Sequence, residues 1–314
     1  MDVLETALAK LHFSKTLYCA HCTNRAPWGV ALPESRSVMF HAVRSGRAWI
    51  RVAGGPPIAL EAGDFVVLPH GDALEMSDER DTPARPVHEQ LSAEQRANPW
   101  VLGFGKQGAP SELICAAFEC AARSADPLLS FLPRMILLRG ADTQSLEPIL
   151  ALAEREMRAS SHALDVVLAR LGEILMVEAV RAYVKTLAPG EGGWLRALHD
   201  PQIASVLRAI HTEPARRWTL AELAGLAAMS RTSLATRFRA LVGTSVHVYI
   251  ARLRMRTAAA MLEDPNRPKL ARVAAEVGYG SEAAFSRAFL REMGVAPTKL
   301  HPRAAKKQPA ERSA

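Results

Sequence analysis

The chain has 314 residues, of which 49% are hydrophobic and 23% charged, and its formal net charge is +7. This length exceeds what one hydrophobic core usually serves, which excludes a single small domain and predicts two. No apolar run approaches about eighteen residues, and charged side chains interrupt the segment 1–15. We therefore expect no signal peptide, no membrane partner, and a cytoplasmic protein whose cysteines are reduced.

A C-x-x-C pair lies near the start of the chain, formed by Cys19 and Cys22 with His21 between them. A structural zinc site needs four ligands, and the other two cysteines, Cys115 and Cys120, are distant in the sequence, so the pair indicates zinc only weakly. Two interpretations stay open. The thiols are buried and inert, or they form a redox-sensing pair, which needs an electropositive environment that a sequence does not reveal.

Short strands are predicted over residues 37–76. SVMFHAV (37–43) and RAWIRVA (47–53) alternate as half-buried strands do, and Gly54-Gly55 closes a hairpin between strands. GDFVVLPHG (63–71) runs a buried strand into a tight turn. Together these segments predict a small β-barrel or sandwich.

Residues 144–187 are strongly helical in pattern. They carry two apolar stripes, and the second is the wider: Leu146, Ile149, Leu150 and Ala153, then Leu164, Val167, Leu168, Leu171, Ile174 and Leu175. We expect two antiparallel helices that either join two copies of the protein or cover the open face of the β-structure, since the wide stripe allows both. The glycine-rich segment 189–193 is then expected to be a flexible break between domains.

Positive charge is concentrated after this break. Residues 200–314 contain 19 Lys and Arg against 9 Asp and Glu, a net charge of +10, whereas residues 1–199 contain 20 against 23. A polyanion such as DNA is the partner that this balance indicates, because each neutralised phosphate releases counterions and adds sequence-independent affinity. The alternative is a basic face that serves solubility only.

A helical pattern occurs twice in this basic region. Thr219 and Glu222 have the spacing of a capping box, and Ser281 can cap a later helix. Gly278 and Gly280 permit positive φ in a turn, and a helix followed by a glycine-containing turn and a second helix is typical of DNA-reading motifs. The repeated positions are Leu220, Leu223, Ala224, Ala227, Leu234, Phe238 and Gly243, then Leu270, Val273, Ala274, Val277, Phe285, Phe289 and Gly294.

The two copies are expected to be joined by one helix. Residues 246–262 show its pattern, and Asp264-Pro265-Asn266 ends it. A rigid connection of this kind would place two reading helices one duplex turn, about 34 Å, apart.

Residues from about 202 to 303 resemble the DNA-binding domain of the AraC/XylS transcription regulators, which pairs two helix-turn-helix units across a linker helix. The resemblance rests on WTLAELAGLAAMSRTSLATRFRALVG (218–243), YIARLRMRTAAAML (249–262) and LARVAAEVGYGSEAAFSRAFLREMGVAP (270–297). Val246 stands where a proline is common, and Leu300-His301 replace the usual aromatic-Arg pair. Both departures lie outside the reading helices and therefore concern packing.

The resemblance implies which exposed positions touch DNA. Arg287 can bond a guanine bidentately, Glu282 can accept from a cytosine amino group, and alanines offer only apolar contact. Base-facing candidates are Thr232, Ala235 and Thr236 in the first unit and Glu282, Ala283, Ser286 and Arg287 in the second. Phosphate-contacting candidates, which position the protein without specifying sequence, are Arg231, Arg237 and Arg239.

Residues from about 11 to 138 resemble, more loosely, the cupin-like sensor domain found ahead of this DNA-binding domain in one branch of the family. The matching stretches are APWGVALP (26–33), MFHAV (39–43), AWIRV (48–52) and GDFVVLPHG (63–71). The resemblance implies ligand sensing, with Cys19, Cys22, His41 and His70 as the candidate effector or redox site.

A catalytic metal is not expected in this domain. A working cupin site needs several converging His and carboxylate ligands. His41 is present, but Leu74 stands where relatives often carry the second histidine, and His70 and His88 are expected to be polar turn or loop residues. We predict no metal and no cofactor; the competing hypothesis is a cupin-type metalloenzyme with an accessory DNA-binding domain.

The predicted fold class is therefore α+β and multidomain. It comprises a cupin-like β-barrel with a helical dimerisation segment (8–190), an all-α double helix-turn-helix domain (200–304, with units at about 218–243 and 270–294) and a basic tail (305–314). The predicted function is a DNA-binding transcription regulator controlled by a small-molecule or redox signal. Its expected partners are double-stranded promoter or operator DNA, an unknown effector, RNA polymerase and a second copy of the chain.

Overall fold

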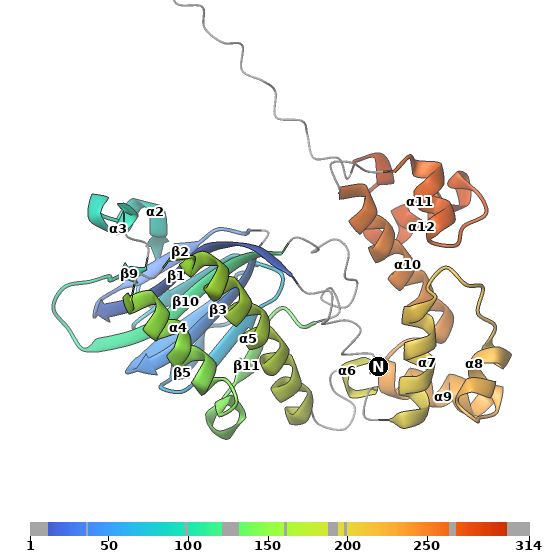
Figure 1. The fold of residues 1–314 in the computed structure, drawn as a ribbon, viewed down its shortest axis with the longest axis horizontal. Helices are drawn as coiled ribbons and strands as arrows, with labels where there is room; N and C mark the ends of the chain where they lie inside the picture. Colours follow the sequence, from blue (N-terminus) through green and yellow to red (C-terminus); the bar gives the residue numbers. More distant parts are fainter. Residues whose placement is uncertain are drawn as a thin grey trace, which may run out of the picture. The chain divides into compact units, whose positions relative to one another are not determined.

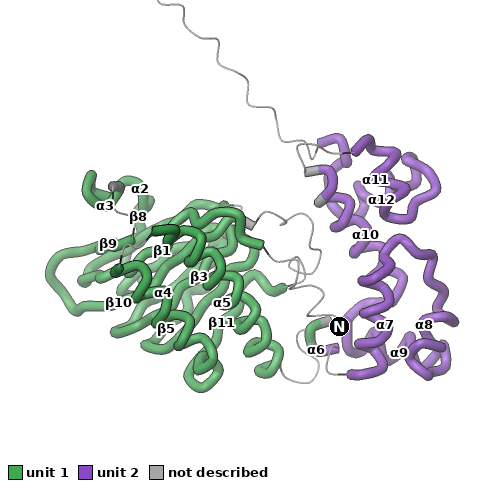
Figure 2. The backbone as a smooth tube through the Cα atoms, viewed as in Figure 1, with its two compact units in different colours: residues 1, 3–122, 128–196 green, residues 2, 123–127, 197–314 purple. Residues whose placement is uncertain are grey.

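The computed structural model describes residues 12–35, 37–97, 100–120, 132–159, 162–187, 194–197, 200–263 and 268–299. The described residues form two compact units that divide at residues 196 and 197, coloured separately in Figure 2. The expected break at 189–193, the helix stop at 264–266, the pair Leu300-His301 and the tail 305–314 lie outside the described residues.

The first unit contains a six-stranded sheet with the strand order β11-β6-β3-β10-β1-β9. All its pairings are antiparallel except that of β1 with β9. Its strands are β1 (Phe13–Arg25), β3 (Ser37–Ser45), β6 (Phe65–Leu68), β9 (Val101–Leu102), β10 (Pro110–Cys120) and β11 (Ile136–Leu138).

A second sheet of five strands has the order β5-β4-β7-β2-β8. It comprises β2 (Gly29–Leu32), β4 (Arg47–Val52), β5 (Ile58–Glu61), β7 (Leu74–Ser77) and β8 (Arg85–Pro86). The predicted hairpin is confirmed, since β4 pairs with β5 and the N–H of Gly55 donates to the carbonyl of Val52 at 2.9 Å. The described strands thus pair into two sheets, which is the sandwich form of the cupin-like barrel or sandwich that the sequence predicted.

The prediction of a half-buried strand at residues 37–43 was wrong. Every residue from Ser37 to Val43 is buried, because β3 lies inside the six-stranded sheet and both of its faces are covered. Met39 and Val43 join the core between the two sheets, whereas Phe40 contacts Phe118 and Phe65 on the other face.

Helices cover that other face, as Figure 1 shows for α4 (Glu147–Ala159) and α5 (Leu164–Thr186). These are the two helices that the sequence predicted. Gly172 lets α5 approach the sheet, since a Cβ there would lie 2.8 Å from the Phe118 ring. Arg44 of β3 holds α4 through Glu147 and Glu154, at 2.6 and 3.0 Å. Two short helices, α2 (Val87–Gln90) and α3 (Ala93–Ala97), and the 3-10 turn η2 (Gly140–Thr143) complete the unit.

The second unit is helical. Its elements are α7 (Pro201–Thr212), α8 (Leu220–Leu226), α9 (Arg231–Val242), α10 (Val246–Glu263), α11 (Leu270–Glu276), α12 (Glu282–Met293) and η3 (Pro297–Lys299), and α6 (Trp194–Ala197) lies at the division between the units. The single connecting helix predicted at 246–262 is confirmed as α10. None of the helices in the described ranges is both long and apolar enough to cross a membrane.

Candidate DNA-binding surface and effector cavity

The predicted repeat is present in the second unit. Helices α8 and α11 each have 7 residues, and α9 and α12 each have 12. The side chain of Ser230 accepts from the Ser233 N–H at 3.1 Å, and that of Ser281 accepts from the Ala284 N–H at 3.2 Å. Each of the two longer helices ends at a left-handed glycine. The same local signals therefore start and stop both predicted recognition helices.

The turns within the two copies are equivalent but not identical. The N–H of Met229 bonds the Ala224 carbonyl at 2.9 Å, and the N–H of Tyr279 bonds that of Ala274 at 2.8 Å. The left-handed residue is Ala228 in the first turn, with φ 50°, and Gly278 in the second, with φ 80°. We expected positive φ to be possible at both Gly278 and Gly280, but only Gly278 adopts it. One left-handed residue is enough to reverse the chain in this turn.

The first helix of the first copy carries the capping box that the sequence predicted. The hydroxyl of Thr219 accepts from the Glu222 N–H at 3.2 Å, and the Thr219 N–H donates to the Glu222 carboxylate at 2.8 Å. Its hydroxyl also donates to that carboxylate at 2.7 Å, and these bonds lower the pKa of Glu222. The equivalent helix α11 has no side-chain cap at Lys269.

Helix α10 contributes to the cores of both copies. Near its start, Tyr249 is 1% exposed and its ring packs edge-on against Phe238 of α9, with centroids 5.6 Å apart. Further along, Met255, Ala258 and Leu262 share a buried cluster with the apolar residues of α11 and α12. In Figure 1 the helix runs between the two pairs. Each copy therefore uses its own half of α10 to complete its core.

A contact across α10 was not predicted. The guanidinium of Arg254 donates to the carbonyls of Pro214, Ala215 and Arg216, at 2.7, 3.1 and 2.8 Å. This loop joins α7 to α8, and its Ala215 carbonyl lies against the Cα of Gly278 in the second turn. The first copy is thus tied to the second by one arginine and one glycine. The sequence indicated the conformation of Gly278, but nothing local in it indicates what packs there.

The candidate base-contacting residues lie on the outward faces of α9 and α12. Thr232, Ala235, Thr236, Glu282, Ala283 and Arg287 are exposed, and Ser286 is half-buried. On the inward faces, Leu234, Phe238, Phe285 and Phe289 are each 0% exposed. Both helices therefore have one buried and one open side, as the spacing of their apolar residues predicted.

The three candidate phosphate contacts differ in their surroundings. Arg231 and Arg239 are exposed and make no ion pair with the described residues. Arg237 instead pairs with the carboxylate of Asp200 at 2.6 Å and bonds the Gln202 amide at 3.3 Å. Asp200 is also the N-cap of α7. Arg237 thus fixes α9 to α7.

The first unit contains a largely apolar cavity of about 290 Å³ between its two sheets. Alternate residues of β1 face it, with Tyr18 and Cys22 contributing directly. Cys115 of β10 lies in register with His41 of β3, and both side chains line the cavity. The remaining lining residues come from β2 and β7, from the segment that holds α2 and α3, and from the strand β9 region: Val30, Leu32, Met76, Val87, Leu91, Gln95, Arg96, Leu102 and Phe104.

Three buried polar atoms on residues that line this cavity have no hydrogen-bond partner within the described part of the chain. They are both ring nitrogens of His41 and the hydroxyl of Tyr18. His41 is 1% exposed, and burial lowers its pKa to about 4, so its ring is neutral at pH 7. Burial also raises the pKa of Tyr18. A buried polar group without a hydrogen bond costs about 1–3 kcal/mol, so these three atoms are an unusual feature of a folded core.

The cysteines are not arranged as the C-x-x-C pattern suggested. Cys19 lies three residues before Cys22 on the same strand, so the two side chains point to opposite faces of the sheet. The thiol that accompanies Cys22 is that of Cys115, and this contact together with burial raises the pKa of Cys115. Burial raises the pKa of Cys19 to about 12. Raised thiol pKa values favour inert thiols, because the thiolate is the reactive form.

The other candidate residues lie apart from the cavity or take no part in it. The His70 ring bonds the Leu132 carbonyl at 2.9 Å, consistent with a role at the turn after β6. Leu74 is 2% exposed in β7. We expected His88 to lie in a turn or loop, but it lies in the short helix α2. Among the described residues no three His, Cys, Asp or Glu side chains converge as ligands of a metal ion.

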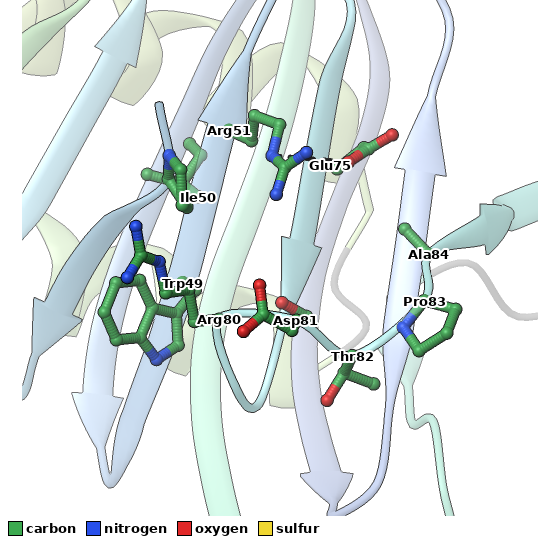
Figure 3. Close-up of a pocket in the computed structure, with 11 residues that line it drawn as sticks. Trp49, Ile50, Arg51, Glu75, Arg80, Asp81, Thr82, Pro83 and Ala84 are labelled. Carbon is green, nitrogen blue, oxygen red and sulfur yellow. Dashed lines mark ion pairs between the residues drawn. The ribbon is translucent and has the colours of Figure 1, made fainter. Parts of the chain in front are cut away.

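A second pocket, of about 300 Å³, lies on the five-stranded sheet and is charged. Figure 3 shows Arg51 of β4 paired with Glu75 of β7, and beside them Arg80 and Asp81 from the following loop. The ion pair is long, at 3.8 Å, and both of its side chains are exposed. The sequence analysis predicted no role for these residues. None of the described side chains that line this charged pocket has a buried polar atom without a hydrogen-bond partner, in contrast to those of the apolar cavity.

Comparison with known proteins follows the same division. A cupin family model matches residues 2–185, more than half of the chain, and a helix-turn-helix domain model matches residues 223–303. An AraC-like transcription regulator of Streptomyces lividans is 34% identical over 300 residues, covering 94% of this chain and 95% of that protein. One from Streptomyces antibioticus is 31% identical over 299 residues, with coverages of 94% and 95%. Among solved structures, ToxT of Vibrio cholerae with bound unsaturated fatty acid aligns at 13% identity, TM-score 0.39, and coverages of 92% and 95%.

These features define a two-part regulator, with a cupin-like sensor domain ahead of a double helix-turn-helix domain. The chain belongs to the family of AraC-like transcription regulators. It is a DNA-binding transcription regulator, and the fold class and family resemblance predicted from the sequence are confirmed.

Proposed function

We propose that this regulator reads its DNA target through the exposed faces of α9 and α12, and that the apolar cavity of its N-terminal domain binds the small molecule that controls it. The duplication of the recognition helix carries the proposal. The two helices have equal length and the same serine N-cap and glycine C-cap, and they expose every position assigned to base contact except the half-buried Ser286. An exposed helix face that follows a tight turn suits the major groove.

The exposed side chains divide the work of recognition. Arg287 and Glu282 carry the hydrogen-bonding groups that discriminate guanine and cytosine, whereas Ala235 and Ala283 can contact only apolar edges such as a thymine methyl. Thr232, Thr236 and Ser286 add hydroxyl groups. Arg231 and Arg239, which are exposed, hold phosphates. Arg237 contributes indirectly, because its ion pair with Asp200 orients α9.

We assign sensing, not catalysis, to the N-terminal domain. Its cavity lining is mostly apolar. By the resemblance to cupin-like domains, Leu74 stands where relatives often carry a second histidine. The two compact units support a division into a sensor domain (8–190) and a DNA-binding domain (200–304). This chain then responds to a ligand and passes the signal to its DNA-binding half.

We also propose that the protein acts as a homodimer and contacts RNA polymerase. Support for the dimer comes from α5, where Val166 and Ile174 are 59% and 48% exposed although the helix otherwise packs on the sheet. These two large apolar side chains lie two turns apart on the exposed side of α5, with the exposed Arg170 between them, and we propose that a second copy covers them. The contact with RNA polymerase rests on the family's role in transcription.

The test is selection of binding sites by the full-length protein from a pool of random duplexes. We expect one preferred site with two readable segments about one helical turn apart. Changing Thr232 and Thr236 to alanine should alter preference in one segment, and changing Glu282 and Arg287 should alter it in the other. Arg272→Ala is the control, because this exposed arginine pairs with Glu276 at 2.7 Å on α11, a helix to which no base contact is assigned. A single readable segment, or equal effects of all variants on both, would contradict the proposal.

A further inference from the structure

We infer that the effector is a neutral, mainly apolar molecule with a single hydroxyl or carbonyl group, which hydrogen-bonds to His41 and Tyr18 in the cavity between the sheets. The inference rests on the proposed sensing function and names the chemistry of its ligand. It follows from the size of the cavity, the composition of its wall, and the polar atoms that lack a partner inside it.

The size and wall of the cavity set the body of the ligand. An engineered cavity of about 150 Å³ accommodates benzene, so about 290 Å³ accommodates roughly twelve non-hydrogen atoms. Val30, Leu32 and Met76 from one sheet and Phe104 from the segment after β9 form apolar walls. A compact hydrocarbon skeleton of one or two rings, or a short chain, matches this space.

The polar group of the ligand is set by His41 and Tyr18. A neutral imidazole carries one N–H donor and one acceptor nitrogen, and a phenol can both donate and accept. Their three polar atoms are buried, belong to side chains that line the cavity, and have no hydrogen-bond partner among the described residues. A hydroxyl group could accept from one and donate to another, and a carbonyl oxygen could accept from both. One such group would give a partner to two of these three atoms, one on His41 and the hydroxyl of Tyr18.

The same surroundings disfavour an anionic ligand. His41 is uncharged and enclosed by the apolar wall, so it offers no positive charge to a carboxylate. Of the described residues that line the cavity, Arg96 is the cation; it is exposed and donates to the His88 carbonyl at 3.3 Å. A carboxylate near His41 would therefore be buried without a counter-charge, which is strongly unfavourable. A carboxylic acid would instead have to place its carboxylate beside Arg96. The experiment below distinguishes this from binding of a neutral ligand at His41 and Tyr18.

Three probes of one shape test this assignment with the full-length protein. They are 2-naphthol, which carries one hydroxyl; naphthalene, which carries none; and 2-naphthoate, which is an anion. We expect 2-naphthol to bind once per chain by titration calorimetry at pH 7, and at least about tenfold more tightly than either of the others, because one buried hydrogen bond is worth about that factor. Equal binding of naphthalene, tighter binding of 2-naphthoate, or binding of none would overturn the inference.

Variants connect the binding to the named atoms. Tyr18→Phe removes only the hydroxyl and should weaken 2-naphthol about tenfold while leaving naphthalene unchanged. His41→Leu should do the same, and Tyr18→Phe remains informative if that variant fails to fold. His88→Gln is the control outside the cavity lining. Unchanged 2-naphthol binding in Tyr18→Phe and His41→Leu would refute the assignment. DNA binding that ignores bound 2-naphthol would instead refute the proposed control and leave the ligand class standing.

Discussion

The Cα of Gly278 lies directly against the carbonyl oxygen of Ala215, so that a methyl group added at Gly278 would overlap it. Ala215 belongs to the loop held by Arg254, and Gly278 forms the turn of the second helix-turn-helix copy. The close approach of these two residues fixes one copy of the motif against the other.

Gly278→Ala should therefore damage the domain more than an equivalent change elsewhere. Gly243 is the matched control, since its φ of 79° nearly equals the 80° of Gly278 but no atom lies within 4 Å of its added Cβ. Both variants place an alanine in the left-handed region, which costs each of them about 1–2 kcal/mol of the free energy of unfolding. Gly278→Ala should lose about 1–3 kcal/mol more of the free energy of unfolding, from overpacking. Urea denaturation of both variants measures the difference, and equal losses would show that the contact is not tight.

Arg287 and Arg239 should have distinguishable effects on DNA binding. Arg287→Ala should cost about 1–3 kcal/mol at the preferred site and relax specificity at one or two base pairs. Arg239→Ala should weaken all sequences alike and lower the salt slope by about one. The measurement is the affinity for a panel of single-base variants at two salt concentrations. If Arg287→Ala keeps the parent's preference at every position, the second copy does not read bases through this residue.

Neighbouring residues of α12 should separate stability from recognition. Phe289 is 0% exposed, and its ring contacts that of Phe285 at a centroid distance of 5.5 Å. Phe289→Ala should lose about 3–5 kcal/mol of unfolding free energy. Leu290, adjacent in sequence and 52% exposed, is the control, and Leu290→Ala should change stability by no more than about 0.5 kcal/mol. Thermal melting measures the stability of both variants. Similar losses of stability would mean that the buried face of α12 is misassigned.

The DNA-binding domain should function without the sensor. A fragment from about His199 to the end of the chain keeps α7 to α12 and all candidate DNA contacts, and we expect it to fold and bind the preferred site without effector. Circular dichroism and a mobility-shift assay check the two parts. An unfolded fragment, or a folded one that does not bind DNA, would contradict the proposed domain boundary.

His41 should make the sensor domain sensitive to acid. The unfolded chain takes up a proton on this histidine below about pH 6.5, whereas burial in the folded state holds the pKa at about 4. Stability from this source is therefore complete above pH 6.5 and is lost as the pH falls from 6.5 to 4, in total about 3 kcal/mol. The other titratable groups on the cavity are Tyr18, Cys22, Cys115 and Arg96.

The effect is measured as the difference in unfolding free energy between the parent and His41→Gln at pH 4.5 and pH 7. Both proteins share all other titrating groups, which cancel in the difference. We expect the parent to lose more stability on acidification than the variant, and His88→Gln should behave as the parent does. Equal pH dependence of parent and His41→Gln would mean that His41 is accessible to protons in the folded protein.

Local signals made the second unit largely predictable from sequence. A serine followed by a helical stripe and a terminal glycine fixes where α9 and α12 begin and end, and each signal acts within a few residues. The capping box at Thr219 and Glu222 is of the same kind. The order of these helices and their buried faces followed directly from the spacing of their apolar residues.

The cavity depended on pairings that no local pattern contains. Cys115 meets Cys22 and His41 only because β10 lies between β1 and β3, although it comes much later in the sequence than either of them. The C-x-x-C spacing left open a redox pair of Cys19 with Cys22 beside the interpretation as inert thiols, but on a strand these two side chains face opposite ways. Burial of β3 on both faces was missed for a similar reason, because the covering helices come more than a hundred residues later.

The shared helix α10 limits how the specificity of this regulator could be exchanged with that of a relative. Each recognition helix is supported by its own half of α10, so a transplanted motif that brings only its two short helices would meet an unmatched core. A chimaera that preserves packing must carry the supporting half as well, with its junction inside α10 between Leu253 and Met255. Arg254 lies at that junction. Its hydrogen bonds to the loop at residues 214–216 must be preserved in the chimaera.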